Sequence, residues 1–95
     1  MRLLSVVPAI DGEHKYTATF EMDTGRTKTV HFGAKGYMDF TAHRDRRRRQ
    51  LYLARHRYRE DWNDPTTAGA LSRWLLWERP SFREALQAFR QRFRI

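Results

Sequence analysis

The first third of the chain alternates apolar and polar positions with a period of two. Tyr16, Ala18 and Phe20 would lie on one face of a strand, with threonines on the other. The segment 27–32 alternates again, and the residues between the two segments include a glycine that permits positive φ. This pattern predicts an antiparallel β-hairpin, with residues 3–7 as a candidate third strand. Because two strands are marginally stable in water, the hairpin must pack against helices.

The pattern changes near residue 41, where apolar positions begin to recur at spacings of three and four. Either Asp39 or Thr41 can cap a helix that runs to about Asp61. Its predicted inward stripe is Phe40, His43, Arg47 (by its methylene stem), Leu51, Ala54, Tyr58 and Trp62. The sequence therefore predicts one long helix through the middle of the chain.

Two shorter helices are predicted after a break. Asp64 is a good N-cap and Pro65 a good first residue for a helix that ends near Trp77. The next helix begins with the capping-box pattern of Ser81 and Glu84. Its phenylalanines recur on one side, which makes it the most regular of the predicted helices.

The predicted fold class is α+β. A small antiparallel β-hairpin, or three strands, at the N-terminus packs against about three helices. Residues 1–95 are expected to form a single domain, with the strands within about 1–36 and the helices within about 39–95. Gly69 is expected to allow close contact with another backbone. At least two of the three tryptophans are expected in the core.

The composition adds a strong positive charge to this picture. The net charge is +8, and only three of the 19 basic residues are lysines. Arginine has a planar fork that grips phosphates and carboxylates with two hydrogen bonds. A GC-rich genome would explain the choice of arginine over lysine but not the excess of positive charge. Such an excess repels itself, so an acidic partner is expected.

Most of this charge is concentrated in the predicted long helix. The candidate contacts with a nucleic acid or an acidic partner are Arg44, Arg46, Arg47, Arg48, Arg49, Arg55, Arg57, Arg59 and, in the preceding loop, Lys35. Tyr52 and Tyr58 lie among them and could stack on bases. Arg48, Arg55 and Arg59 are expected to share one face. Three interpretations stay open: contact with nucleic acid, contact with an acidic protein, and a solvated basic face with Tyr58 in the core.

Other chemistry finds little support in the sequence. Without cysteine there are no disulfides, zinc ribbons or thiol chemistry. His43 and His56 are 13 residues apart, which is not the spacing of a helical metal site. Asp45 and Glu60 are expected to pair with nearby arginines rather than to act in catalysis. The sequence therefore predicts no enzyme, no metal, no cofactor and no small-molecule substrate.

The sequence also limits the setting of the protein. No apolar run approaches the roughly 18–20 residues that span a bilayer. The apolar start is interrupted by Pro8, so it is interpreted as an edge strand or docking arm rather than a signal peptide. Gly33 to Gly36 lack the spacing of a phosphate-binding loop and are expected to connect a strand to a helix. We expect the protein inside a cell or a virion, not secreted.

A series of motifs between Phe32 and Pro80 carries a family resemblance. They are Phe32-Gly33-Ala34-Lys35-Gly36-Tyr37, Asp39-Phe40-Thr41 with His43 and Asp45, Arg55-His56 with Glu60 and Trp62, Asp64-Pro65, Thr67-Ala68-Gly69, Leu71-Ser72-Arg73, Leu75-Leu76-Trp77 and Pro80-Ser81. Together they resemble a family of short proteins, a domain of unknown function, that is abundant in large nucleocytoplasmic DNA viruses of algae and amoebae. The chain departs from that family in using arginine where such proteins often carry lysine.

This resemblance implies a viral setting and transfers no catalytic residue. Small basic proteins of such viruses commonly serve as minor capsid components, genome-condensing proteins or internal virion proteins. The first hypothesis is therefore a non-enzymatic structural protein, a minor capsid- or genome-associated component of the virion. The alternative is a nucleic-acid-binding protein, either DNA-condensing or bound to RNA in a ribosomal or nucleoprotein particle. The expected location is the virion and the interior of the infected cell.

Overall fold

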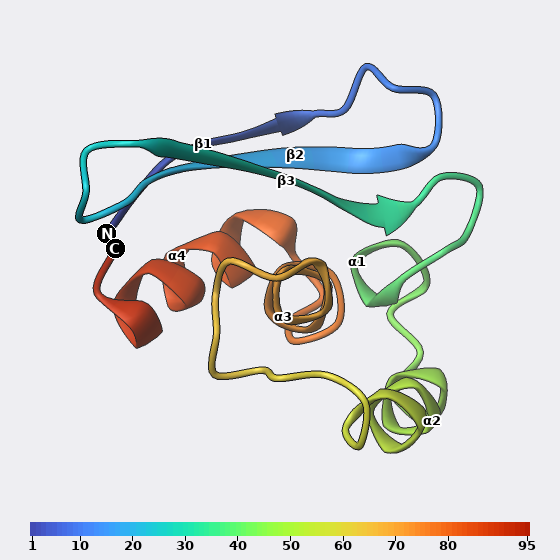
Figure 1. Cartoon of the computed structure of the whole chain (residues 1–95). Helices are drawn as coiled ribbons and strands as arrows, with labels where there is room; N and C mark the ends of the chain where they lie inside the picture. Colours follow the sequence, from blue (N-terminus) through green and yellow to red (C-terminus); the bar gives the residue numbers. More distant parts are fainter.

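The computed structural model describes residues 1–95 and has two layers. One layer is a three-stranded antiparallel sheet in the order β1-β2-β3, and helices cover one of its faces (Figure 1). The strands are β1 (Arg2–Pro8), β2 (His14–Glu21) and β3 (Thr27–Ala34). The helices are α1 (Phe40–His43), α2 (Arg46–His56), α3 (Ala68–Leu75) and α4 (Phe82–Phe93). The predicted α+β class and the candidate third strand are both confirmed.

The period-two pattern of the strands sets the face that the sheet buries. Tyr16 pairs with Phe32, and Ala18 pairs with Val30, across β2 and β3. Ala18 and Phe20 are fully buried, as the alternation predicts. The strands need a partner layer because two or three strands alone hide too little apolar surface.

Helices α3 and α4 provide that layer. Leu71 and Leu75 of α3 and Phe89 of α4 have essentially no exposed surface. The hydroxyl of Ser81 accepts a hydrogen bond from the Glu84 backbone N–H, so α4 begins where the capping pattern predicts. Figure 1 shows α3 and α4 beneath the sheet and α2 set off to one side.

The prediction of one long helix is wrong, because two separate helices form on either side of Arg44 and Asp45. Helix α1 ends at His43, and Arg44 adopts a left-handed conformation with φ of 56°. Asp45 then caps α2, because its carboxylate accepts hydrogen bonds from the backbone N–H groups of Arg47 and Arg48 at 2.9 and 3.2 Å. An aspartate is more favourable at an N-cap than inside a helix. Helix α2 ends at His56, not near residue 61.

The start of α3 and the contact at Gly69 also differ from the prediction. Asp64 forms a turn by accepting from the backbone N–H of Thr66 at 2.9 Å, so Thr67 becomes the N-cap and α3 begins at Ala68. Gly69 does allow a close approach, but to a side chain rather than to a backbone. A Cβ at this position would lie 2.7 Å from the Glu60 Cδ.

Candidate functional site

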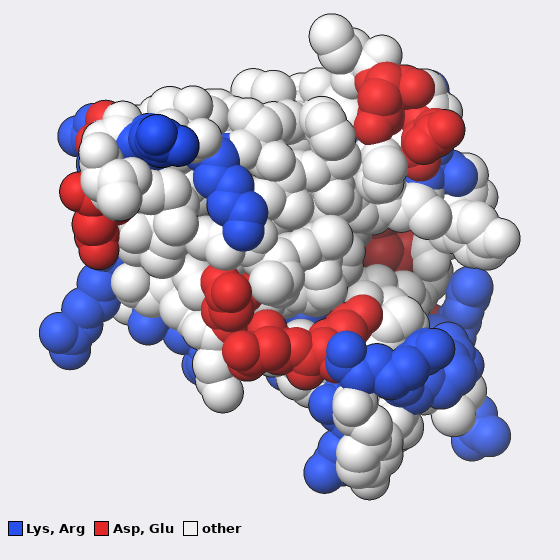
Figure 2. Space-filling model, viewed as in Figure 1, with Lys and Arg blue, Asp and Glu red and all other residues white.

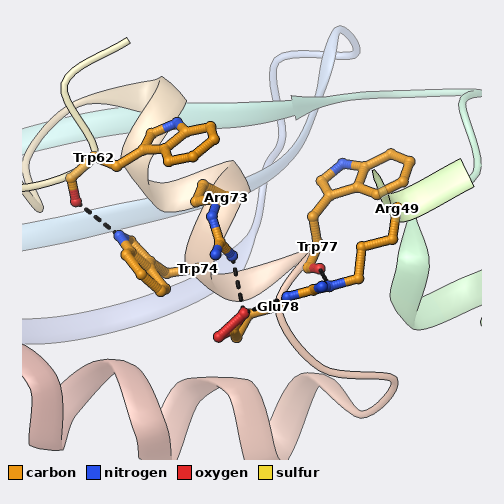
Figure 3. A network of polar contacts seen from close by, with 6 residues as sticks. All are labelled: Arg49, Trp62, Arg73, Trp74, Trp77 and Glu78. Atoms are coloured by element: carbon orange, nitrogen blue, oxygen red, sulfur yellow. Dashed lines mark hydrogen bonds and ion pairs between the residues drawn. The ribbon is translucent and has the colours of Figure 1, made fainter. Parts of the chain in front are cut away.

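Helix α2 is held to the body of the molecule by one of its arginines. The Arg49 Nε donates to the Trp77 carbonyl oxygen at 2.6 Å, and its guanidinium also pairs with the Glu78 carboxylate at 2.5 Å (Figure 3). Glu78 also pairs with a second arginine, Arg73 of α3, at 3.0 Å. Arg49 was predicted to contact a partner. In the structure it instead binds within the chain and links α2 to the residues that follow α3.

Aromatic stacking gives α2 a second attachment. The Tyr52 ring lies parallel to the Trp77 ring, with 4.1 Å between the centroids and 5° between the planes. His56 covers the other side of Tyr52 at 4.1 Å. Tyr52 is 9% exposed, and this burial raises the pKa of its hydroxyl. The prediction that Tyr52 could stack on bases is therefore wrong, because both of its ring faces are occupied.

The predicted inward stripe of α2 is rotated relative to the observed one. Leu51 is 47% exposed and Tyr58 is 82% exposed, whereas Arg49, Tyr52 and His56 face the body. The break at residues 44 and 45 causes this difference, because it uncouples α2 from the phase of α1. Tyr58 is not in the core, and Arg57 lies over its ring at 5.0 Å.

The remaining arginines of this segment are exposed and have no carboxylate within 4.0 Å. They are Arg44, Arg46, Arg47, Arg48, Arg55, Arg57 and Arg59. Figure 2 shows basic side chains gathered over α2 at the lower right of the molecule. We call these seven residues the arginine surface. Lys35 is also exposed and unpaired, in the loop that follows β3.

The carboxylates expected to neutralise the arginine surface are used elsewhere. Asp45 binds backbone N–H groups at the start of α2. Glu60 accepts from the Trp62 indole N–H at 2.9 Å and pairs with His56 at 2.9 Å. The prediction that Asp45 and Glu60 pair with arginines is therefore wrong, and the arginine surface keeps its charge.

The geometry of α2 distributes the arginine surface around the exposed side of the helix. With 3.6 residues per turn, Arg48 and Arg55 lie on the same flank, and both line one groove. Arg46 lies toward the opposite flank, and Arg47 points between the two. Arg59 lies beyond the end of α2 and does not line the groove, so the face predicted to hold three arginines holds two of them.

The groove beside α2 has a volume of about 660 Å³ and was not predicted from the sequence. Its walls come from α2 and α3, from β2 and β3, and from the loop between β3 and α1. Tyr37 and Met38 at its rim are 75% and 55% exposed. Two adjacent apolar residues just before the Asp39 cap were the only sequence signal for it.

Tryptophans and arginines also pack together on the other side of α3. The Arg73 guanidinium lies 4.2 Å from the Trp74 ring and 5.0 Å from the Trp62 ring. Burial lowers the pKa of Arg73, and the hydrogen bond to Glu78 opposes this effect. Trp74 is buried at 8% exposure, while Trp62 and Trp77 are half-buried against the core, so one tryptophan and not the predicted two lies fully in the core.

Comparison with known proteins identifies a family but no individual relative. No curated protein and no solved structure matches the chain. No helix in the structure has the length and apolar character required to cross a bilayer. The family described as "Family of unknown function (DUF5754)" matches residues 4–56, from β1 to the end of α2. The match covers more than half of the chain and includes most of the arginine surface, but it carries no information on viral distribution. This chain therefore belongs to DUF5754, a family of unknown function.

Proposed function

We propose that this chain is a non-enzymatic binding protein that attaches to an acidic surface of a larger assembly through the arginine surface. One observation carries the proposal: seven exposed arginines on and around α2 have no carboxylate partner. Positive charges gathered on and around one helix repel one another unless anions pair with them. An external anion would remove this repulsion. The proposal assigns no catalytic residue, metal or cofactor.

The setting that we propose is the virion of a large DNA virus, where the chain would be a minor capsid- or genome-associated component. The support is the resemblance between its motifs and a family of short proteins from such viruses. A basic surface suits an assembly role because acidic capsid surfaces and packaged nucleic acid both attract it. The protein would then occur in the virion and in the interior of the infected cell.

Nucleic-acid binding is the second candidate, and the distribution of the arginines favours it. Arg46 and Arg48 lie on different flanks of α2, with Arg47 between them. Arginines on both flanks of a helix can reach separate rows of phosphates. Binding of this kind weakens steeply with salt, in proportion to the number of phosphates contacted.

Analysis of purified particles tests the virion proposal. Mass spectrometry should detect the chain in particles purified from cells infected with the virus that encodes it, and enriched relative to the cell lysate. Retention after nuclease and high-salt treatment of opened particles would favour the capsid, whereas release by nuclease would favour the genome. Presence in the lysate with absence from the particles would contradict the proposal.

A further inference from the structure

We propose that the groove beside α2 is a docking site for a peptide segment in which a large apolar side chain is flanked by carboxylates. This inference rests on the proposed function and specifies its partner as an acidic protein. The groove would receive the apolar side chain, and Arg48 and Arg55 would bind the flanking carboxylates.

The apolar character of the groove is the first support. Tyr37, Met38 and Leu51 line it and are 75%, 55% and 47% exposed. Leu76, also in the lining, is 2% exposed and closes the groove toward the core. Exposed apolar side chains around a concave surface are typical of sites that bind another protein or a ligand. The volume of about 660 Å³ accommodates a large side chain together with part of its backbone.

The charges in the groove provide the second support. Lys15 is paired with Asp39 at 2.5 Å, and His56 is paired with Glu60 at 2.9 Å. The two charged groups that line the groove without an ion-pair partner are Arg48 and Arg55. They are seven residues apart, so they lie about 10 Å apart along the helix axis. This spacing places positive charge on both sides of Leu51 and matches carboxylates on both sides of an apolar anchor.

The aromatic rings argue against a nucleobase as the occupant. A base would need an open ring face inside the groove. Both faces of Tyr52 are covered, one by Trp77 and one by His56. His43 lies beside the Trp77 ring, with 5.3 Å between the centroids and 59° between the planes. The ring that stays open is that of Tyr37, whose 75% exposure places it at the rim of the groove and not inside it.

Two labelled peptides of equal charge test this proposal. The first is Glu-Glu-Leu-Phe-Glu-Glu, and the second has serines in place of the leucine and phenylalanine. Fluorescence anisotropy of the full chain should show at least about tenfold tighter binding of the first peptide, because only that peptide has large apolar side chains to bury. Leu51→Ser and Met38→Ser should each reduce this preference. Leu4→Ser, at a position 41% exposed on β1 and outside the groove, should leave it unchanged.

The outcomes separate this proposal from the proposed function. The two peptides could bind equally, with the binding of both lost in the Arg48→Gln, Arg55→Gln double variant. This result would overturn the groove proposal but leave the proposed role of the arginine surface standing. Absence of binding by the first peptide would also overturn the groove proposal. A third result would also overturn the groove proposal. If single-stranded DNA displaces the first peptide, and Leu51→Ser weakens the binding of that DNA, the groove binds nucleic acid. Circular dichroism and thermal unfolding of each variant exclude misfolding as the cause.

Discussion

Arg47 and Arg49 are two residues apart in α2, yet they have different roles. Arg49 is half-buried and is bound to the Trp77 carbonyl and the Glu78 carboxylate. Arg47 is exposed and has no such partner. Residue type and sequence position did not distinguish the two arginines, because the partners of Arg49 lie almost 30 residues further along the chain.

Substitution of Arg49 should therefore affect stability more than substitution of Arg47. Arg49→Ala removes two charge-assisted hydrogen bonds and leaves the Trp77 carbonyl without this donor, so we expect a loss of about 1–3 kcal/mol in the free energy of unfolding. Arg47→Ala should change that free energy by less than about 0.5 kcal/mol. Urea unfolding of both variants measures the difference. Equal effects would show that the tie to Glu78 does not stabilise the fold.

The turn at Asp64 makes the stability of the fold depend on pH. The backbone N–H and the hydroxyl of Thr66 bind the Asp64 carboxylate and hold its pKa below the ordinary value of 3.8. Because the pKa is lower in the folded state, the carboxylate stabilises the fold above pH about 4, and this stabilisation is lost as the pH falls through the folded pKa.

Asp64→Asn should therefore lower stability at neutral pH and have a smaller effect near pH 2. The measurement is the difference in unfolding free energy between the wild type and the variant, determined by urea unfolding at several pH values. This comparison cancels the contributions of Asp11 and Asp23, whose pKa values are also lowered by hydrogen bonds. A difference that stays constant with pH would contradict the role assigned to the Asp64 charge.

At the scale of elements, the sequence predicted the strands and the last helix better than the middle of the chain. Alternation is imposed by burial of one sheet face, so Tyr16, Ala18 and Phe20 identify β2 directly. Helical spacing did not reveal the break at Asp45, because a local cap competes with continuation of the helix without changing the apolar pattern. The groove forms where two helices, two strands and a loop meet, which no local pattern encodes.

The cap at Asp45 should be important for α2 because this helix buries few residues of its own. Asp45→Ala removes the acceptor for two backbone N–H groups and should cost about 1 kcal/mol, whereas Asp45→Ser should retain most of the stability. Hydrogen exchange should show faster exchange of the α2 amides in Asp45→Ala, with α4 less affected. Unchanged protection of α2 in Asp45→Ala would mean that packing of Tyr52 against Trp77 alone defines the helix.

The whole molecule consists of a sheet-and-helix body with α2 attached along one side (Figure 1). Residues Leu71, Leu75 and Phe89 give the body its core, whereas α2 depends on Arg49 and Tyr52 for its position. This arrangement separates two tasks: the body provides stability, and the attached helix presents charge. Acidic side chains also lie on the face seen in Figure 2, but none is ion-paired with an arginine of the arginine surface.

This separation predicts that the position of the arginines, and not their total number, determines binding. One triple variant replaces Arg47, Arg48 and Arg55 by glutamine, which preserves helix propensity. The matched control replaces Arg26, Arg79 and Arg83, which are also exposed and unpaired but lie outside α2. Both variants lose the same charge, so non-specific attraction to a polyanion should weaken equally in both.

The most direct test is the affinity of these two variants for labelled poly-L-glutamate, measured by fluorescence anisotropy at low and at near-physiological salt. We expect the α2 variant to bind at least about tenfold more weakly than the wild type, and the control to lose less than about threefold. If both variants lose affinity to the same extent, net charge alone attracts the anion, and the arginine surface is not the binding site.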